Sequence, residues 1–270
     1  MSDQPSAFAG ARGAIIAACA EMARLLTGLN DTHGRVADEV HQARKAGKRL
    51  RGALVMTGEP KPCIRWIAVI GRMLGGSRDA AVRVKTWHSL GTMVAPAGSA
   101  EAAVAALLEL EAQASTRRPP PAVIDWSLAA LNQVKVRIEA QTDDEVAKAA
   151  EDGAGKLEKQ LRKRLKRALE RVSNEDFHAC RKAAKAWLGG MALTAPEVKL
   201  PAQEEAENLA SSLGDENDLE VLSDWLEARG FTPGVCPAAW KILRKRQEKI
   251  RRKSISLIRK ELLPALKRAD

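Results

Sequence analysis

Tyrosine is absent from the 270-residue chain, and only three phenylalanines accompany its six tryptophans. Alternating runs of valine, isoleucine and threonine, which are typical of half-buried strands, are also missing. Alanine, leucine, lysine, arginine and glutamate dominate instead, and these are strong helix formers. Since 45% of the residues are hydrophobic, the chain can bury a substantial core. The composition therefore predicts an all-α protein.

The four cysteines form no CxxC pair, which excludes the usual zinc frameworks and disulfide scaffolds. They are Cys19, Cys63, Cys180 and Cys236. Isolated thiols of this kind are typical of a reducing cytoplasm. The first apolar segment is interrupted by Arg12, Glu21 and Arg24, so it predicts an amphipathic helix and neither a signal peptide nor a membrane span. We therefore expect a cytoplasmic protein that does not insert into membranes.

Acidic residues are outnumbered, with 34 Asp and Glu against 44 Lys and Arg, and the formal net charge is +10. Such a balance favours an acidic partner, such as nucleic acid, an anionic membrane or another polyanion. The sequence also contains no phosphate-binding glycine loop, no serine or cysteine triad pattern and no carboxylate cluster for a metal. It predicts a protein that is not an enzyme and that needs no cofactor or metal.

Helical periodicity runs through nearly the whole chain, with glycine and proline at the breaks. The proline run at 119–121 marks a stop and a restart. The last predicted helix either kinks at Pro264 or frays beyond it. The predicted helices span residues 6–27, 35–57, 62–74, 78–93, 99–117, 122–141, 144–172, 175–193, 202–213, 217–228 and 236–268.

Two motifs occur twice in the same order. The segment VHQARKAGKRLRGAL at 40–54 aligns with FHACRKAAKAWLGGM at 177–191, and MLGGSRDAAV at 73–82 aligns with SLGDENDLEV at 212–221. The two alignments differ in offset by only about two residues, which makes chance resemblance improbable. We expect two similar helical bundles related by a pseudo-twofold, with a basic central surface between them. Together they form one domain over residues 6–268, made of repeats at about 6–118 and about 120–268.

The first motif places cations on one helix face and apolar residues on the other. His41, Arg44, Lys45 and Lys48 share an arc of about 100°, and Arg49 and Arg51 flank that arc. Like charges at this spacing repel by a few tenths of a kcal/mol per pair. The second motif repeats the arrangement with His178, Arg181, Lys182 and Lys185. Either these faces are solvated, or a bound anion offsets the repulsion; the repetition and the lack of acids favour an anion.

Small residues lie beside both cationic faces, and they allow close approach of either another helix backbone or a ligand. The glycines of the second motif, Gly75 and Gly214, are predicted to end helices in the left-handed conformation. Asn217 would then cap the helix that follows.

Two further helices carry cations whose direction the sequence leaves open. They either face solvent or turn toward the histidine helices and deepen one basic channel. The residues concerned are Lys163 and Arg167 in 156–172, and Lys245, Arg252 and Arg259 in the last helix.

Phosphate groups suit these faces, because arginine forks and lysine ammonium groups match phosphate oxygens. A phosphate beside His41 or His178 would favour the imidazolium form. Proteins that bind single-stranded nucleic acids use aromatic residues for base stacking, and proteins that recognise duplex bases use Asn or Gln. The cationic faces lack both kinds of residue. A nucleic-acid-binding protein and a helical scaffold that docks an acidic protein nevertheless remain alternatives.

The pattern His-x-x-Arg-Lys-x-x-Lys, followed each time by Leu-Gly-x-x-x-Asp, resembles the CHAD family, the conserved histidine α-helical domain. The resemblance spans roughly residues 6–268. It implies an all-helical repeat whose basic central surface binds inorganic polyphosphate, in some members at polyphosphate granules. No triphosphatase domain accompanies it here, so the resemblance implies no hydrolysis.

Carried over by position, the resemblance implicates ten residues in binding polyphosphate: His41, Arg44, Lys45, Lys48, Arg49, Arg51, His178, Arg181, Lys182 and Lys185. It adds Arg78, which precedes the aspartate of the first Leu-Gly-x-x-x-Asp copy. The second repeat departs from the pattern at Ala186, Leu188 and Asn217, where cations are expected. We therefore expect the second repeat to hold phosphate more weakly than the first.

Overall fold

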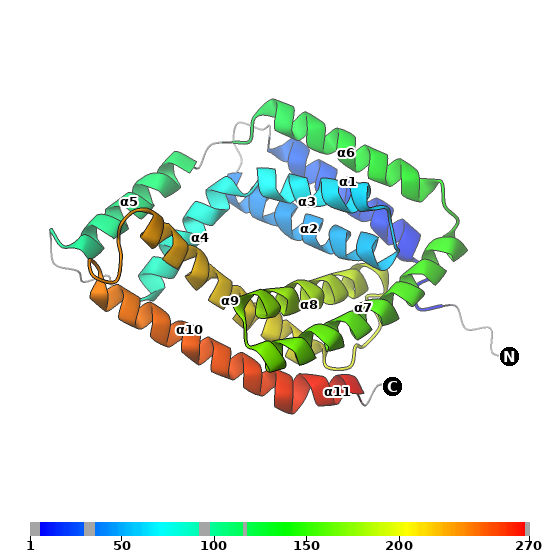
Figure 1. Ribbon diagram of the computed structural model, residues 1–270. Coiled ribbons are helices and arrows are strands. Elements are labelled where there is room, and N and C mark those ends of the chain that lie inside the picture. Colours follow the sequence, from blue (N-terminus) through cyan, green and yellow to red (C-terminus); the bar gives the residue numbers. More distant parts are fainter. Residues whose placement is uncertain (1–5, 30–35, 92–97, 116–117, 268–270) are drawn as a thin grey trace.

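The computed structural model describes residues 6–29, 36–91, 98–115 and 118–267, and this part of the chain is helical almost throughout (Figure 1). No strand occurs within it, which confirms the predicted all-α fold. The first predicted repeat contains α1 (Ala11–Gly28), α2 (Val36–Met56), α3 (Lys61–Met73), α4 (Gly76–Ser89) and α5 (Ala100–Ser115). The second contains α6 (Pro121–Glu139), α7 (Asp143–Arg171), α8 (Asn174–Thr194), α9 (Gln203–Ala228), α10 (Pro237–Leu257), η1 (Ile258–Leu262) and α11 (Leu263–Lys267).

Helix α9 corrects the prediction of two helices at 202–213 and 217–228, because it runs through without a break. Gly214 lies in its interior, and Asn217 therefore caps nothing. Gly75 has φ −77°, so neither glycine adopts the predicted left-handed conformation. Each of the two glycines instead leaves space for an arginine side chain, Arg44 at Gly75 and Arg181 at Gly214.

Several helix ends follow from local sequence. The Thr142 hydroxyl accepts a hydrogen bond from the Glu145 amide, and the Glu145 carboxylate accepts one from the Thr142 amide, which forms a capping box for α7. The last helix is disturbed before Pro264, as expected, because proline lacks an amide hydrogen and crowds the preceding turn. The chain accommodates it by widening into the π-helical turn η1.

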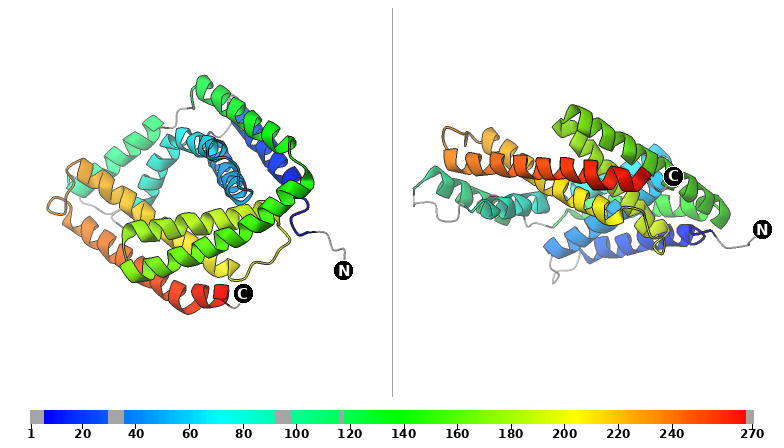
Figure 2. Two further views of the ribbon diagram at one scale, coloured as in Figure 1. Left: turned by 45° about the vertical axis from the view of Figure 1, so that its right-hand side comes forward. Right: turned by 90° about the horizontal axis from the view of Figure 1, so that it is seen from below.

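The packing order is the same in both repeats. Helices α1 and α2, α2 and α3, and α4 and α5 pack together, as do α7 and α8, α8 and α9, and α9 and α10. Helices α2 and α8 pair with each other at the centre of the molecule, whereas α10 forms an outer edge (Figures 1 and 2). The pseudo-twofold relation itself stays a prediction.

Glycine brings α2 and α8 into backbone contact. A Cβ on Gly52 would lie 2.7 Å from the Gly190 nitrogen and 2.9 Å from the Ala186 carbonyl oxygen. A Cβ on Gly190 would in turn lie 3.1 Å from the Gly52 oxygen. The small residues of the repeated motif thus serve helix packing, one of the two roles predicted for them.

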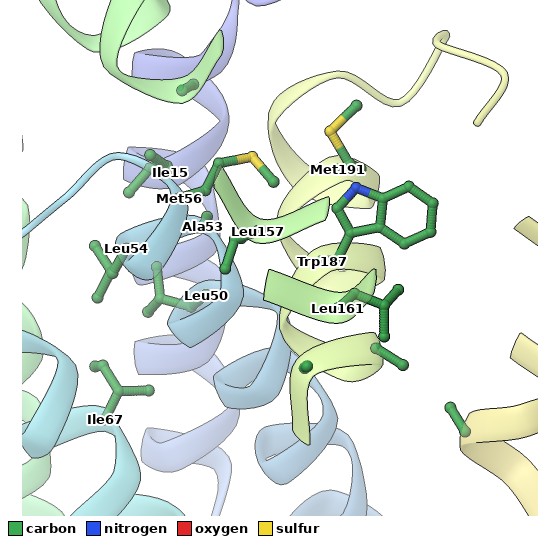
Figure 3. Packing of buried hydrophobic residues seen from close by; sticks show 14 of the residues in the cluster. Ile15, Leu50, Ala53, Leu54, Met56, Ile67, Leu157, Leu161, Trp187 and Met191 are labelled. Atoms are coloured by element: carbon green, nitrogen blue, oxygen red, sulfur yellow. The ribbon is translucent and has the colours of Figure 1, made fainter. Parts of the chain in front are cut away.

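The buried residues form two cores, and each core draws on both repeats. The larger one joins α1, α2 and α3 with α6, α7, α8, the start of α9 and the C-terminal turns. Figure 3 shows part of it, where Leu157 of α7 lies beside Leu50 and Ala53 of α2, and Leu161 lies beside Trp187 of α8. The smaller core joins α4 and α5 with the end of α9 and α10. The central helices are therefore held rigidly from several sides.

All four cysteines are buried and unpaired, and burial raises the thiol pKa of Cys19 and Cys180 to about 12. Such thiols stay protonated and act as small apolar side chains. Within the described residues, no helix combines the length and the apolarity that a bilayer crossing requires.

Candidate functional site

The two histidine helices divide their faces as predicted. The apolar residues of α2 and α8 are buried: Ala43, Leu50, Leu54, Phe177, Cys180, Ala184, Trp187 and Met191. The cations lie on the remaining faces and are half-buried or exposed. Packing of the apolar sides against the larger core therefore sets the direction in which the cations project.

Arg44 of α2 is largely enclosed, with 15% of its side chain exposed. Its Nη1 donates a hydrogen bond to the Gly71 carbonyl oxygen at 2.8 Å, and its Nη2 lies 3.6 Å from Asp79 Oδ1. A Cβ on Gly75 would lie 2.6 Å from the same Nη1. The Leu-Gly-x-x-x-Asp motif thus makes room for this guanidinium and supplies its carboxylate.

Arg181 repeats this arrangement on α8. Its Nε and Nη2 lie 3.7 Å from where a Cβ on Gly214 would stand. Burial lowers the pKa of Arg181, while Asp218 and Asp215 oppose that effect. Each repeat therefore places one arginine against the glycine of its own Leu-Gly-x-x-x-Asp motif, with the aspartate close by.

Cations of the two repeats meet between α2, α4 and α8, and we call this set the central cluster: Arg44, Lys48, Arg78, Arg181 and Lys185. Burial lowers the pKa of Lys185, and the charges of Arg181 and Arg78 lower it further, against Asp218. Arg78 also lowers the pKa of Arg44 and of Arg181. A single arginine from α4 thus acts on cations of both repeats.

Lys48 shows how strongly these charges interact. The residue is exposed, yet the protein atoms around its ammonium group lower its pKa to about 8, together with the charges of Lys185, Arg78, Arg44 and Arg181. The largest electrostatic contributions to this shift all come from cations. A bound anion would stabilise the charged form of a lysine in such surroundings.

The two histidines occupy equivalent positions but have different neighbours. His41 is exposed, and burial, Arg78, Lys48 and Lys45 lower its pKa, against Asp38. His178 is half-buried; burial, Lys182 and Arg181 lower its pKa, while Glu220 and a hydrogen bond with Asn217 raise it. Asn217 stands where Arg78 stands in the first repeat, so His41 faces a cation and His178 faces an amide.

The remaining predicted residues of α2 and α8 surround the central cluster. Lys45, Arg49 and Lys182 are exposed. Arg51 is half-buried, and burial together with the charge of Arg72 lowers its pKa. The structure therefore brings the residues of the histidine helices together, with Arg51 directed toward α3.

The cations of the other helices lie elsewhere. Lys163 is exposed on α7, and Arg167 forms an ion pair of 2.8 Å with the buried Asp176 at the start of α8. On α10 and η1, the predicted residues Lys245, Arg252 and Arg259 are exposed. Because α10 packs on α9 at the outer edge (Figure 2), these three serve a solvent-facing surface, and Arg167 serves the α7–α8 contact.

Sequence reasoning missed the pairing of Arg44 with Asp79, because this pair forms only when α4 packs beside α2. It also missed Arg72, although this residue lies just before the Leu-Gly-x-x-x-Asp motif and Ser211 replaces it in the second repeat. Arg251 of α10 was missed as well: it pairs with buried Glu216 and lies 4.1 Å over the Phe177 ring, beside His178. Because α10 carries many other cations, nothing in the sequence distinguishes Arg251 from its neighbours.

The arrangement concentrates positive charge from both repeats in one place. Within the described residues, no three His, Cys, Asp or Glu side chains gather as metal ligands. The chemistry that these side chains offer is the binding of anionic oxygens by lysine ammonium and arginine guanidinium groups.

Comparison with known proteins is decisive for the family. The CHAD domain family profile matches residues 14–227. The chain belongs to the CHAD domain family. Its fold is similar to the crystal structure of the CHAD domain from the plant Ricinus communis, with a TM-score of 0.51 and 18% sequence identity. That likeness covers 96% of this chain and 90% of the plant chain, and it shows a common fold. No curated protein shows significant similarity to the chain.

Proposed function

We propose that this CHAD domain binds inorganic polyphosphate at the central cluster and does not hydrolyse it. One observation carries the proposal: Lys48 and Lys185 come from different repeats, yet the charge of Lys185 lowers the pKa of Lys48. Repulsion between two like charges destabilises the fold, so the stability of the fold does not explain why these lysines are held together. A linear polyanion offsets their repulsion along its whole length.

Polyphosphate suits the central cluster better than nucleic acid does. The central cluster contains lysine and arginine alone, and the nearby aromatic residues Phe177 and Trp187 are buried in the core. Single-stranded nucleic acids gain about 1–3 kcal/mol per base from stacking on exposed aromatic rings. A chain of phosphates without bases needs no such surface, and it places its charges closer together.

The two repeats contribute unequally to this site. The first supplies Arg78 beside His41, whereas the second supplies Asn217 beside His178. We propose that the first repeat makes the stronger phosphate contacts. Lys45, Arg49 and Lys182 are exposed at the margin and would add electrostatic attraction, which salt screens.

A competition experiment tests the proposal. Labelled long-chain polyphosphate is titrated with the protein at physiological salt, and unlabelled RNA, duplex DNA or polyglutamate is then added at equal charge. We expect polyphosphate to displace each competitor more effectively than the reverse. Preferential retention of RNA or of polyglutamate would favour a nucleic-acid-binding protein or a scaffold for an acidic protein, respectively.

The same protein, incubated with polyphosphate and magnesium, should release no orthophosphate above background. Turnover that a substitution in the central cluster abolishes would show an enzyme instead. In a cell that stores polyphosphate, we propose that the domain associates with polyphosphate granules. A fluorescent fusion should follow the granules, and substitution of the central cluster should disperse it.

A further inference from the structure

A pocket of about 180 Å³ opens between α2 and α3, next to the central cluster. It is lined by the small residues Gly47, Gly71 and Ala68 and by the apolar residue Ile67. Four cations complete the lining: Arg44, Lys48, Arg51 and Arg72. Among the described residues, no carboxylate lines this α2–α3 pocket.

Arg51 of α2 and Arg72 of α3 both line the pocket, and their charges interact. Burial lowers the pKa of Arg51, and the charge of Arg72 is the other cause. Arg44 is held in place from behind by its hydrogen bond to the Gly71 carbonyl oxygen. The pocket therefore presents three guanidinium groups, of which that of Arg44 is fixed before any ligand arrives, and this lowers the entropy cost of binding.

The second repeat has lost the equivalent of this pocket. By the alignment of the two motifs, Arg51 corresponds to Leu188 and Arg72 to Ser211, while Ala68 corresponds to Glu207. Two of the four cations are thus missing, and an exposed carboxylate is added. Only one end of the shared site can therefore bind a group of high negative charge.

A polyphosphate chain has such groups at its ends. An internal phosphate carries one ionised oxygen, whereas a terminal phosphate has a second ionisable oxygen, which for phosphate monoesters titrates near pH 6. Arginine forks bind such a terminal group by two parallel hydrogen bonds. A pocket with three arginines at one end of a cationic row fits the end of a chain better than its middle.

We propose that the α2–α3 pocket binds the terminal phosphate of a polyphosphate chain, while internal phosphates extend along the central cluster toward α8. This inference rests on the proposed function. It makes the domain specific for chain ends and gives Arg51 and Arg72 a role that Arg181 and Lys185 of the second repeat do not share.

The test compares polyphosphate of one defined length with free ends and with both ends capped as methyl esters. The wild-type protein should bind the free-ended chain at least about tenfold more tightly, since the cap removes a charged hydrogen-bonding group. The double variant Arg51→Leu/Arg72→Ser copies the residues of the second repeat and should bind both chains alike. The single variant Arg72→Ser, at an exposed position, should lose part of the preference with its helical signal unchanged.

The control Lys245→Ser/Arg252→Ser removes the same charge from the outer face of α10 and should keep the full preference. Equal binding of capped and free chains by the wild type would overturn the inference while leaving the proposed function intact. So would an undiminished preference in the double variant, or tighter binding of ATP than of tripolyphosphate. Failure of the wild type to bind any polyphosphate would instead overturn both.

Discussion

Lys48 of α2 and Lys185 of α8 occupy equivalent positions in the two repeats, and the charge of Lys185 acts on Lys48 across the centre of the molecule. Burial and the charge of Lys185 are the two largest causes that lower the pKa of Lys48 to about 8. The backbone contact of Gly52 with Gly190 holds the two helices at this separation. Helix packing and charge concentration are thus two consequences of the same repeated motif.

The lowered pKa of Lys48 predicts that polyphosphate affinity falls as the pH rises above about 8. Below that pH Lys48 is already protonated, whereas above it the binding of an anion must draw a proton from solution. Affinity measured from pH 7 to 9.5 should decline for the wild type and stay nearly flat for Lys48→Arg, because arginine remains charged. Proton uptake at pH 8.5, measured calorimetrically in two buffers, should vanish in that variant.

The same shift predicts the opposite trend for the stability of the ligand-free protein. The folded state holds the proton of Lys48 less tightly than the unfolded chain, whose lysines titrate near 10.4. Between these two pKa values the unfolded state binds more protons, so stability rises with pH. The melting temperature should therefore increase from about pH 8 to 10 more in the wild type than in Lys48→Gln; equal slopes would contradict this account.

Exchange of Arg78 and Asn217 tests the inequality of the repeats. Arg78→Asn gives the first repeat the neighbour that His178 has, and it should weaken polyphosphate binding by about tenfold or more. Asn217→Arg adds a cation to the second repeat and should strengthen binding. Fluorescence titration with one chain length is sufficient. Unchanged affinity in Arg78→Asn would show that the arginine of α4 lies outside the site.

Arg44 and Lys45 are adjacent cations with different roles. Arg44→Ala removes the donor to the Gly71 carbonyl oxygen and the partner of Asp79, so it should cost about 1–3 kcal/mol of stability. Lys45 is exposed, and Lys45→Ala should change stability by less than about 0.5 kcal/mol. Urea unfolding of both variants measures the difference, and equal stability would mean that Arg44 does not hold α3 to α2.

Gly52→Ala should be among the most destabilising single substitutions. Its Cβ would meet the α8 backbone at 2.7 Å, and helix backbones cannot rotate away as side chains do. We expect a cost of about 3 kcal/mol or more, at the upper end for overpacked sites. Gly155→Ala, in a helix with nothing within 4 Å, is the matched control and should stabilise by about 0.5–1 kcal/mol.

The helices, their buried faces and the cationic faces of α2 and α8 were predictable, because each depends on residue spacing along one helix. The contacts that side chains make with residues of other helices were not predictable. Gly75 and Gly214 were read as helix ends, since the sequence shows where glycine stands and not which arginine lies against it. Arg72 was missed for the same reason: its role arises only when α3 packs beside α2.

The grouping of helices into cores also lay beyond the sequence. The repeat suggests that each half folds around itself, yet Leu222 of α9 packs in one core with Val104 and Leu108 of α5. Hydrophobic periodicity shows that a face is buried but does not name the helix that covers it. Likewise, Lys163 and Lys245 show the same cationic spacing as Lys48, and only the fold separates outer faces from the centre.

One measurement tests the central claim most directly, namely that the central cluster and not overall charge binds polyphosphate. The variant Lys48→Gln/Arg78→Asn/Lys185→Gln is compared with Lys163→Gln/Lys245→Gln/Arg252→Asn, which removes the same charge from exposed outer positions. Titration with long-chain polyphosphate at physiological salt should show a loss of at least about a hundredfold for the first variant and less than about threefold for the second. Equal losses in the two variants would contradict the account.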